Sequence, residues 1–371
     1  MSGLKHILVI GGGIAGASIA YEAAATHRVT LVETEAALGY HATGRSAAMY
    51  LAGYGNEVIR ELTVASRSFF QEPPPGFAAA PILKRRGLLT IAEPGDEARL
   101  DGPEFRGQES LTPAHAQAVV PCLRADTIVA AMFDRDAADI DVDLLHQGYV
   151  RAARARGVTI LSNENIVSAG RADGGWSIDT SAGPIAADVV INAGGAWADQ
   201  IAGLFGAAPV GLSAMRRTAV LIDPPALAEF DRWPMVMTAK EDLYFKPDAG
   251  MLLVSPADET PTEPCDAQPD EWDVAVAIDR LQTISDVPVR HIAHRWAGLR
   301  TFAPDRAPVV GYDPALPDFF WFAGQGGYGL QMAPALARLG ASLLNGAADL
   351  GGLDSLVHRL APDRCGLAAT S

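Results

Sequence analysis

The chain has 371 residues, of which 49% are hydrophobic and 20% charged, a composition ordinary for a soluble globular protein. This length exceeds one typical hydrophobic core and predicts two domains. The 44 acidic and 29 basic residues give a net charge of −15, which argues against nucleic acid or an anionic membrane surface as a partner. The three cysteines form no C-x-x-C motif, so we expect reduced thiols in a cytoplasmic protein.

Two further patterns bear on membranes and metals. No apolar run approaches the roughly eighteen residues of a membrane span. The few residues before the first predicted strand leave no room for the apolar region of a signal peptide. The histidines show no metal-ligand spacing, and we expect no metal site.

The first strong signal is a strand, a glycine loop and a helix at the start of the chain. Ile7 to Ile10 is a continuous apolar run, typical of a strand buried on both faces. It leads into GGGIAG, a G-x-G-x-x-G motif, and then into an alanine-rich helical segment from Ala17 to Thr26. A second buried strand, Val29 to Val32, ends at Glu33. The order of these elements predicts a dinucleotide-binding unit.

Each residue of this unit has a physical reason to be there. Gly11 makes the tight turn, Gly13 lets the backbone approach a pyrophosphate, and Gly16 lets helix and strand pack closely. The helix N-terminus, with Ile14 and Ala15, directs free N–H groups at the phosphates. Glu33 is placed to accept hydrogen bonds from ribose hydroxyls.

The next segment, GYHATGRSAAMYLAGYG, is rich in small residues. Thr43, Arg45 and Ser46 are able to bond phosphate or ribityl oxygens, although the segment also fits a plain glycine-rich connector. Asn56 then caps a predicted amphipathic helix that runs through Phe70.

The middle of the chain predicts strands and one helix. Strands are expected at Leu88 to Ile91 and Ile128 to Phe133, and a helix from Asp141 to Gly157. Three further runs, 165–169, 176–180 and 188–192, are expected to form a short meander. The meander ends in a second glycine-rich stretch, which contains Ala193 and Gly194.

Residues from about 212 to 290 predict a β-rich insertion. It contains a hairpin formed by Tyr244 to Pro247 and Met251 to Val254, and a helix over Glu271 to Ile284. The chain then returns to its opening pattern. A buried strand, Phe319 to Phe322, enters the loop AGQGGYG and a helix from about Gln331 to Asn345.

Two glycine-loop-to-helix units, one near each end of the chain, favour FAD over NAD as the cofactor. One helix N-terminus is available for the pyrophosphate and the other for the edge of the flavin ring on which negative charge develops.

The motifs GGGIAGAS, GYHATGRSAA, DIDVDLLHQGY, RWPM, YFKPDAGMLL, WAGLRTF and GQGGYG resemble those of the D-amino-acid oxidase superfamily of FAD enzymes, and within it the bacterial D-arginine dehydrogenases. The resemblance implies an α/β fold with a discontinuous FAD-binding Rossmann domain of glutathione-reductase type. It also implies a second, α+β substrate domain built on a mixed β-sheet. The expected FAD domain comprises residues 1–80, 141–211 and 291–371, and the substrate domain comprises 81–140 and 212–290.

The resemblance also assigns residues to the site. Around FAD it places, besides the residues of the first motif, those of the later glycine-rich segments: Thr43, Arg45, Ser46, Ala47, Val167, Ala193, Gly194, Gly298, Gly326, Gly327, Tyr328, Gly329 and Gln331. It matches Arg300 and Arg217 to the arginines that hold a substrate carboxylate, and Tyr54 and Tyr244 to the tyrosines at the carboxylate and lid. The carbonyl of Gly327 is expected to face the substrate nitrogen. From the residues alone, Arg300 also fits a structural ion pair, and either Arg216 or Arg217 is able to face solvent.

The chain departs from the D-arginine dehydrogenases at two pocket positions. Leu88 aligns with the acid that holds the guanidinium, and Met49 with a pocket histidine. We therefore expect oxidation of a D-amino acid with an apolar side chain to the imino acid, which water converts to a 2-oxo acid and ammonia. The alternatives are oxidation of a secondary amine such as an N-alkyl glycine, oxidation of a 2-hydroxy acid, and a flavin-binding protein without turnover. The electron acceptor, oxygen or a quinone, is left open.

Overall fold

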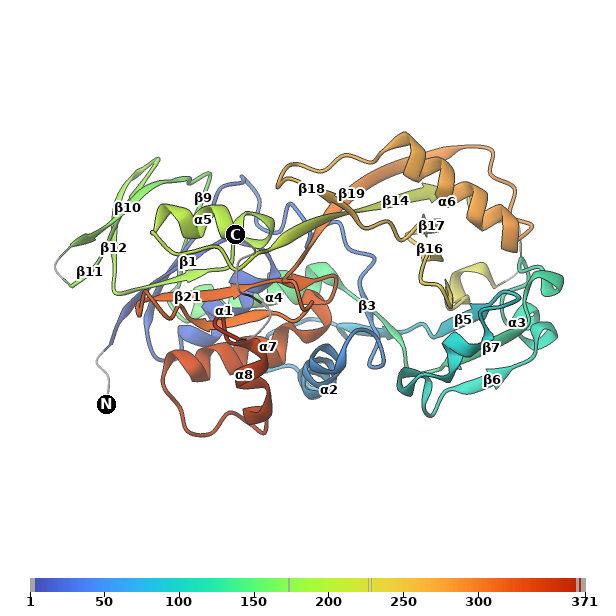
Figure 1. Cartoon of the computed structure of the whole chain (residues 1–371), viewed down its shortest axis with the longest axis horizontal. Helices are drawn as coiled ribbons and strands as arrows, with labels where there is room; N and C mark the ends of the chain where they lie inside the picture. Colours follow the sequence, from blue (N-terminus) through green and yellow to red (C-terminus); the bar gives the residue numbers. More distant parts are fainter. Residues whose placement is uncertain (1–3, 173, 226, 228, 365–366, 368–371) are drawn as a thin grey trace.

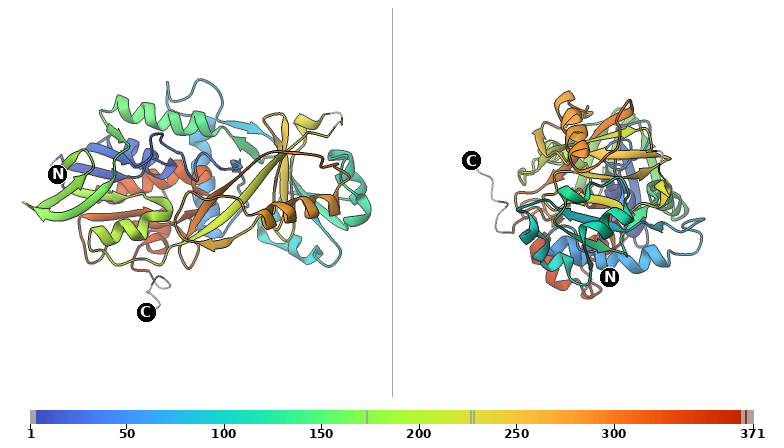
Figure 2. Two further views of the ribbon diagram at one scale, coloured as in Figure 1. Left: turned by 90° about the horizontal axis from the view of Figure 1, so that it is seen from above. Right: turned by 90° about the vertical axis from the view of Figure 1, so that its right-hand side faces the viewer.

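The computed structural model describes residues 4–172, 174–225, 227, 229–364 and 367. It has an α/β fold with mixed sheets, as predicted. A six-stranded sheet and a ten-stranded sheet lie toward opposite ends of an elongated molecule (Figures 1 and 2). Within the described residues, no helix combines the length and the apolar character that crossing a membrane requires.

The six-stranded sheet has the order β20-β21-β13-β1-β2-β9 and is parallel except for β20. Its strands are β1 (His6–Ile10), β2 (Arg28–Glu33), β9 (Thr159–Ser162), β13 (Val189–Asn192), β20 (Val309–Tyr312) and β21 (Phe319–Ala323). The central strands are almost fully buried because layers cover both faces, which explains their continuous apolar runs.

Alternate residues of these strands point toward the two layers that cover the faces of the sheet. Ile7, Val9 and Leu31 pack against the helices on one face, whereas Leu8 and Val32 pack on the other. The helical layer consists of α1 (Ile14–Ala23), α2 (Glu57–Gln71), α4 (Val142–Ala155), α7 (Gly329–Leu344) and the short α8 (Val357–Leu360). The opposite layer consists of a three-stranded meander, β10 (Ile166–Ala172), β11 (Gly175–Thr180) and β12 (Gly183–Ala187), together with α5 (Ala198–Leu204).

The ten-stranded sheet has the order β22-β19-β14-β17-β16-β15-β5-β7-β6, with β18 paired to β14. Its strands are β5 (Leu88–Ala92), β6 (Glu109–Leu111), β7 (Ala130–Asp134), β14 (Ser213–Ile222), β15 (Met235–Thr238), β16 (Tyr244–Asp248), β17 (Met251–Ser255), β18 (Thr260–Thr262), β19 (Ile292–Phe302) and β22 (Gln325–Gly326). The helices α3 (Pro113–Val119) and α6 (Glu271–Ile284) pack with one face of this sheet in a separate apolar core.

A small sheet lies at the junction of the two halves (Figure 1). It contains β3 (Met49–Tyr50), β8 (Ala138–Ile140) and β4 (Leu83–Arg85), all antiparallel. Strands β19 and β22 pair in the large sheet although both follow residue 291, where we expected the FAD domain to resume. The expected domain boundaries therefore remain a prediction, and sheet membership places β19 on the substrate side.

Several local predictions are confirmed. Asn56 caps α2 by accepting a hydrogen bond from the N–H of Ile59, the hairpin is formed by β16 and β17, and α6 has the predicted bounds.

The predicted meander is partly wrong, because its third strand is β12 and not the run 188–192. That run is β13, which inserts beside β1 in the parallel sheet. Strand β19 was not predicted, since its exposed first half carries charged residues without an apolar run.

Candidate functional site

A cavity of about 700 Å³ runs along the carboxyl ends of β1, β2 and β13 and reaches the facing side of the large sheet. We call it the long cavity. This is the edge at which open parallel sheets bind ligands. Its lining includes most residues expected around FAD: Gly11, Gly13, Ile14, Ala15, Glu33, Thr43, Arg45, Ser46, Ala47, Ala193, Gly194, Gly298, Gly326, Gly327 and Gly329.

The three motif glycines have different steric environments. Gly11 has φ +105°, and a Cβ there would come within 2.5 Å of the carbonyl oxygen of Ala193. A Cβ on Gly16 would come within 1.8 Å of the carbonyl oxygen of Gly11, so this glycine is required for the helix to approach the loop. A Cβ on Gly13 would meet only the hydroxyl of Thr43, at 3.2 Å, and otherwise would project into the cavity. Gly13 thus leaves room for a ligand group, which fits a pyrophosphate at this helix N-terminus.

Side chains hold this loop in place. The carboxylate of Glu33 accepts hydrogen bonds from the N–H groups of Gly12 (2.6 Å) and Glu35 (2.9 Å). His146, on α4, donates from Nε2 to the carbonyl of Gly12 at 2.9 Å. Burial lowers the pKa of His146, which keeps the ring neutral.

Arg45 joins the segment after β2 to the large sheet. Its guanidinium donates to the carbonyls of Ala267 and Ala297 and pairs with Asp266. Its own carbonyl accepts a hydrogen bond from the indole of Trp296 at 3.0 Å. The guanidinium is therefore held in the cavity wall by protein partners.

Some expected residues lie outside the lining of the long cavity. Val167 is 62% exposed, and its neighbours Glu164, Asn165 and Ile166 line the cavity instead. Tyr328 is buried behind the loop, where its ring packs against Tyr54. The lining of the long cavity also includes residues that were not predicted from the sequence, among them Tyr40, His41, Trp197 and Gln200.

A second, small cavity of about 50 Å³ adjoins the long cavity, and we call it the small cavity. The two share Ser46, Tyr244, Arg300, Gly327 and Leu330 in their linings. The rest of the small cavity is lined by Ala48, Met49, Leu51, Tyr54, Met235, Met237 and Gln331. No aspartate, glutamate, lysine or histidine belongs to this lining.

Arg300 lies where the two cavities meet. Among the residues that the structure describes, no carboxylate lies within 4.0 Å of its guanidinium nitrogens. Burial lowers the pKa of Arg300, but the phenols of Tyr54, Tyr244 and Tyr328 raise it, and the net direction is upward. The charged guanidinium therefore lies among three phenols, and no described carboxylate is close enough to form an ion pair with it.

The register of β14 separates the two adjacent arginines. Arg217 pairs with Gly298 of β19 and Met215 with Arg300, so Arg217 and Arg300 lie on the same face of the sheet. Arg217 lines the long cavity, but its guanidinium donates to the carbonyl of Asp258 (2.7 Å) and to Glu259 (3.1 Å). Arg216 points the other way and pairs with Asp273 at 2.8 Å.

The remaining predicted pocket residues have distinct positions. Tyr54, Tyr244, Met49 and Gln331 line the small cavity. The amide of Gln331 also accepts from the N–H of Leu51 (3.1 Å) and donates to Thr63 (3.0 Å), so it holds the strand that carries Met49. Leu88, which we expected in the pocket, lines neither cavity and packs in the apolar cluster that contains Met235 and Met237.

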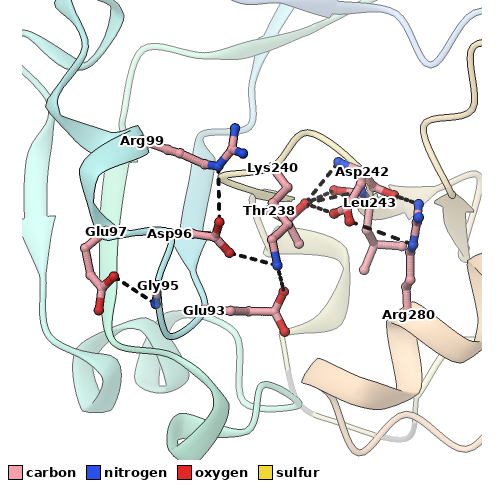
Figure 3. A network of polar contacts seen from close by, with 10 residues as sticks. All are labelled: Glu93, Gly95, Asp96, Glu97, Arg99, Thr238, Lys240, Asp242, Leu243 and Arg280. Atoms are coloured by element: carbon pink, nitrogen blue, oxygen red, sulfur yellow. Dashed lines mark hydrogen bonds and ion pairs between the residues drawn. The ribbon is translucent and has the colours of Figure 1, made fainter.

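A polar network fixes the turn before Tyr244 (Figure 3). The hydroxyl of Thr238 accepts hydrogen bonds from the N–H groups of Asp242 and Leu243 and donates to the Asp242 carboxylate. Lys240 reaches from the turn to Asp96, 2.9 Å away on the neighbouring loop. The turn before Tyr244 is thus held by hydrogen bonds within the turn and by the ion pair between Lys240 and Asp96 on the neighbouring loop.

The fold and cavities define a flavin-dependent oxidoreductase, and comparison with known proteins gives the family. The family model "FAD dependent oxidoreductase" (DAO) matches residues 6–343. The chain belongs to this family, and its cofactor is FAD. Searched over the described residues, the structure contains no group of three or more His, Cys, Asp or Glu residues able to hold a metal ion.

Relatives and solved structures cover nearly the whole chain. The glycine oxidase of Geobacillus kaustophilus is 26% identical over 369 residues, which span 91% of this chain and 92% of the relative. Its crystal structure superposes with a TM-score of 0.81 at 22% identity, covering 95% of this chain and 98% of that one. L-proline dehydrogenase from P. horikoshii (TM-score 0.80, 22% identity, 98% of each chain) and iminodiacetate oxidase from Chelativorans sp. BNC1 (TM-score 0.76, 24% identity, 96% and 98%) share the fold. The narrower resemblance to D-arginine dehydrogenases stays a prediction.

Proposed function

We propose that this chain oxidises the Cα–N bond of a small amino acid whose side chain is absent or short and apolar, namely glycine, an N-alkyl glycine or a small D-amino acid. The product is an imine, which water converts to the 2-oxo acid and ammonia, or to the 2-oxo acid and an alkylamine when the substrate is an N-alkyl glycine. One observation carries the proposal: Arg300, which has no carboxylate within 4.0 Å among the described residues, lies between the long cavity and a small cavity whose lining contains no other charged side chain. The likeness to a glycine oxidase over nine-tenths of the chain supports it.

Arg300 is the proposed carboxylate anchor. A guanidinium presents a planar fork that pairs with a carboxylate through two charge-assisted hydrogen bonds. Tyr54 and Tyr244 border the same space and can each donate a phenolic hydrogen bond without adding charge. Arg217 already has an anionic partner in Glu259, so we assign it to the outer wall of the site.

The small cavity sets the proposed side-chain preference. Its volume of about 50 Å³ is well below the roughly 300–1,000 Å³ of pockets for drug-sized ligands. Its lining contains no carboxylate to neutralise a cationic side chain, so D-Arg and D-Lys are expected to be poor substrates. Methionine side chains repack easily, so graded activity toward longer apolar D-amino acids is expected.

FAD, when bound, supplies the two-electron acceptor for this oxidation. The residues proposed to hold it are Gly13 and the α1 N-terminus at the pyrophosphate, Glu33 at the ribose, and the 326–329 loop with the α7 N-terminus at the flavin. We propose that the carbonyl of Gly327, a residue that lines both cavities, accepts a hydrogen bond from the substrate amine. The lining of the small cavity contains no carboxylate to pair with an ammonium group, so we expect the substrate to react as the neutral amine.

The proposal is tested by anaerobic mixing of the holoenzyme with a panel of candidate substrates while the flavin absorbance is followed. The panel contains glycine, N-methylglycine, D-alanine, D-leucine, D-arginine and a 2-hydroxy acid. Bleaching by the small amine carboxylates, and little by D-arginine, is the expected result. Bleaching only by the hydroxy acid, or by none, contradicts the proposal. Reoxidation by oxygen or by a soluble quinone then identifies the class of electron acceptor.

A further inference from the structure

A buried ion cluster lies beside the small cavity without lining it. Asp139, on β8, accepts hydrogen bonds from Nε of Arg86 (2.7 Å) and from Nζ of Lys246 (2.8 Å). The side chains of Arg86 and Lys246 are only 9% and 4% exposed. One carboxylate thus stands between two buried cations.

Asp139 and its two cationic partners each connect to a different strand that lines the small cavity. Asp139 itself pairs in the backbone register with Met49 of β3. Lys246 is two residues after Tyr244 on β16, so both side chains lie on the same face of that strand. The strand that carries Met49 and the strand that carries Tyr244 are therefore linked through the Asp139–Lys246 ion pair.

Arg86 links Asp139 to the segment that leads into β15. Its Nη1 donates to the carbonyls of Asp231 (2.8 Å) and Trp233 (3.1 Å), just before β15. Strand β15 carries Met235 and Met237, which both line the small cavity. The segment after Arg86 also binds this strand, because the carbonyl of Gly87 accepts from the N–H of Met235 at 3.1 Å.

We propose that Asp139 is a positioning residue that sets the shape, and hence the side-chain selectivity, of the substrate pocket by joining the strands of Met49, Met235 and Tyr244. It does not touch the substrate. This inference rests on the proposed function, because it assumes that the small cavity receives the substrate side chain.

Burial singles out Asp139 as the main counterion of Arg86 and Lys246. Asp248 is the other carboxylate near Lys246, at 3.5 Å, and it is 42% exposed. Asp139→Asn keeps the size of the side chain but leaves two buried cations facing a neutral amide. Such cations separate or take up water, because an uncompensated buried charge is costly. The strands that carry Met49 and Tyr244 are then no longer held together by this link.

The test measures binding of non-oxidisable carboxylates of increasing size, acetate, propanoate and butanoate, through the change they cause in the flavin spectrum of the holoenzyme. The kcat/KM ratio for D-alanine over D-leucine is measured in parallel. We expect Asp139→Asn to flatten the dependence of Kd on ligand size and to change the kcat/KM ratio by about tenfold or more, since small misplacements in a site are costly. Lys246→Arg, which keeps the charge, should retain most of the wild-type selectivity, whereas Lys246→Met should shift it in the direction of Asp139→Asn.

Asp273→Asn is the matched control. It removes an acid of similar exposure that pairs with Arg216 at 2.8 Å, away from the small cavity, although Arg216 also lies 3.7 Å from Asp270 and 3.9 Å from Asp258. A purely structural role for Asp139 predicts that both variants lose thermal stability and that neither changes selectivity, and this result overturns the inference. If Asp139→Asn does not fold, Lys246→Met with unchanged selectivity overturns it equally. If the wild type binds no carboxylate at all, the proposed function fails instead.

Discussion

Gly327 lies directly against the guanidinium of Arg300. A Cβ at this position would come within 2.7 Å of both Cζ and Nε of the arginine. The φ angle of Gly327 is not in the left-handed region, so the need for glycine here comes from the neighbouring side chain and not from backbone strain. The loop before α7 therefore determines where the proposed carboxylate anchor stands.

Gly327→Ala is accordingly expected to displace Arg300. The KM for glycine or D-alanine should rise by about tenfold or more, because a charge-assisted pair depends on its geometry. Steady-state kinetics measure the effect. Gly203→Ala, on α5, is the control, because a Cβ there meets nothing within 4 Å and should leave KM unchanged. Equal KM values for wild type and Gly327→Ala would show that Arg300 does not need its present position.

Gly13 and Gly16 are expected to respond differently to substitution. Gly13→Val should fold with little change in the apoprotein melting temperature yet retain far less FAD, because the new side chain fills the space left for the ligand. Gly16→Ala should destabilise the fold itself, since its Cβ would overlap the carbonyl of Gly11. Flavin absorbance per mole of purified protein and the apoprotein melting temperature separate the two. Full flavin content in Gly13→Val would mean that the pyrophosphate lies elsewhere.

His146 predicts a pH dependence. Its pKa is lowered in the folded state, chiefly by burial, so below about pH 6.5, the ordinary value, the unfolded chain binds a proton that the folded chain resists. The stability associated with neutral His146 is therefore present above that pH and is lost as the pH falls toward the lowered pKa. The melting temperature of wild type should fall more between about pH 7.5 and pH 5.5 than that of His146→Gln. An equal decrease in melting temperature in wild type and His146→Gln would show that His146 does not cause the loss of stability at acid pH.

Much of the cofactor site could be predicted from sequence because backbone geometry demands particular residues there. Gly11 and Gly16 are fixed by contacts with neighbouring backbone, and such glycines stand out in a motif. Glu33 is the last residue of the second strand, as the end of the apolar run 29–32 predicts. These are local relationships, and the sequence shows them without a knowledge of the tertiary fold.

The small cavity could be predicted only in part, because it depends on distant strands. Met235 and Met237 reach it through the parallel pairing of β15 with β5, which no local pattern indicates. The choice between Arg216 and Arg217 is decided by the register of β14 against β19. Leu88 was expected in the pocket from an alignment, yet it packs with the methionines and does not line the cavity.

The proposed role of Arg300 as the carboxylate anchor can be measured by comparing each substrate with the same molecule lacking its carboxylate. The measurement is the ratio of kcat/KM for glycine over methylamine, and for D-alanine over ethylamine, in wild type, Arg300→Met and the control Arg216→Met. Loss of a buried charge-assisted pair costs on the order of 2–5 kcal/mol, so wild type and Arg216→Met should prefer the carboxylates by roughly thirtyfold or more. Arg300→Met should retain FAD and lose this preference. An Arg300→Met variant that still discriminates as strongly as wild type would contradict the account.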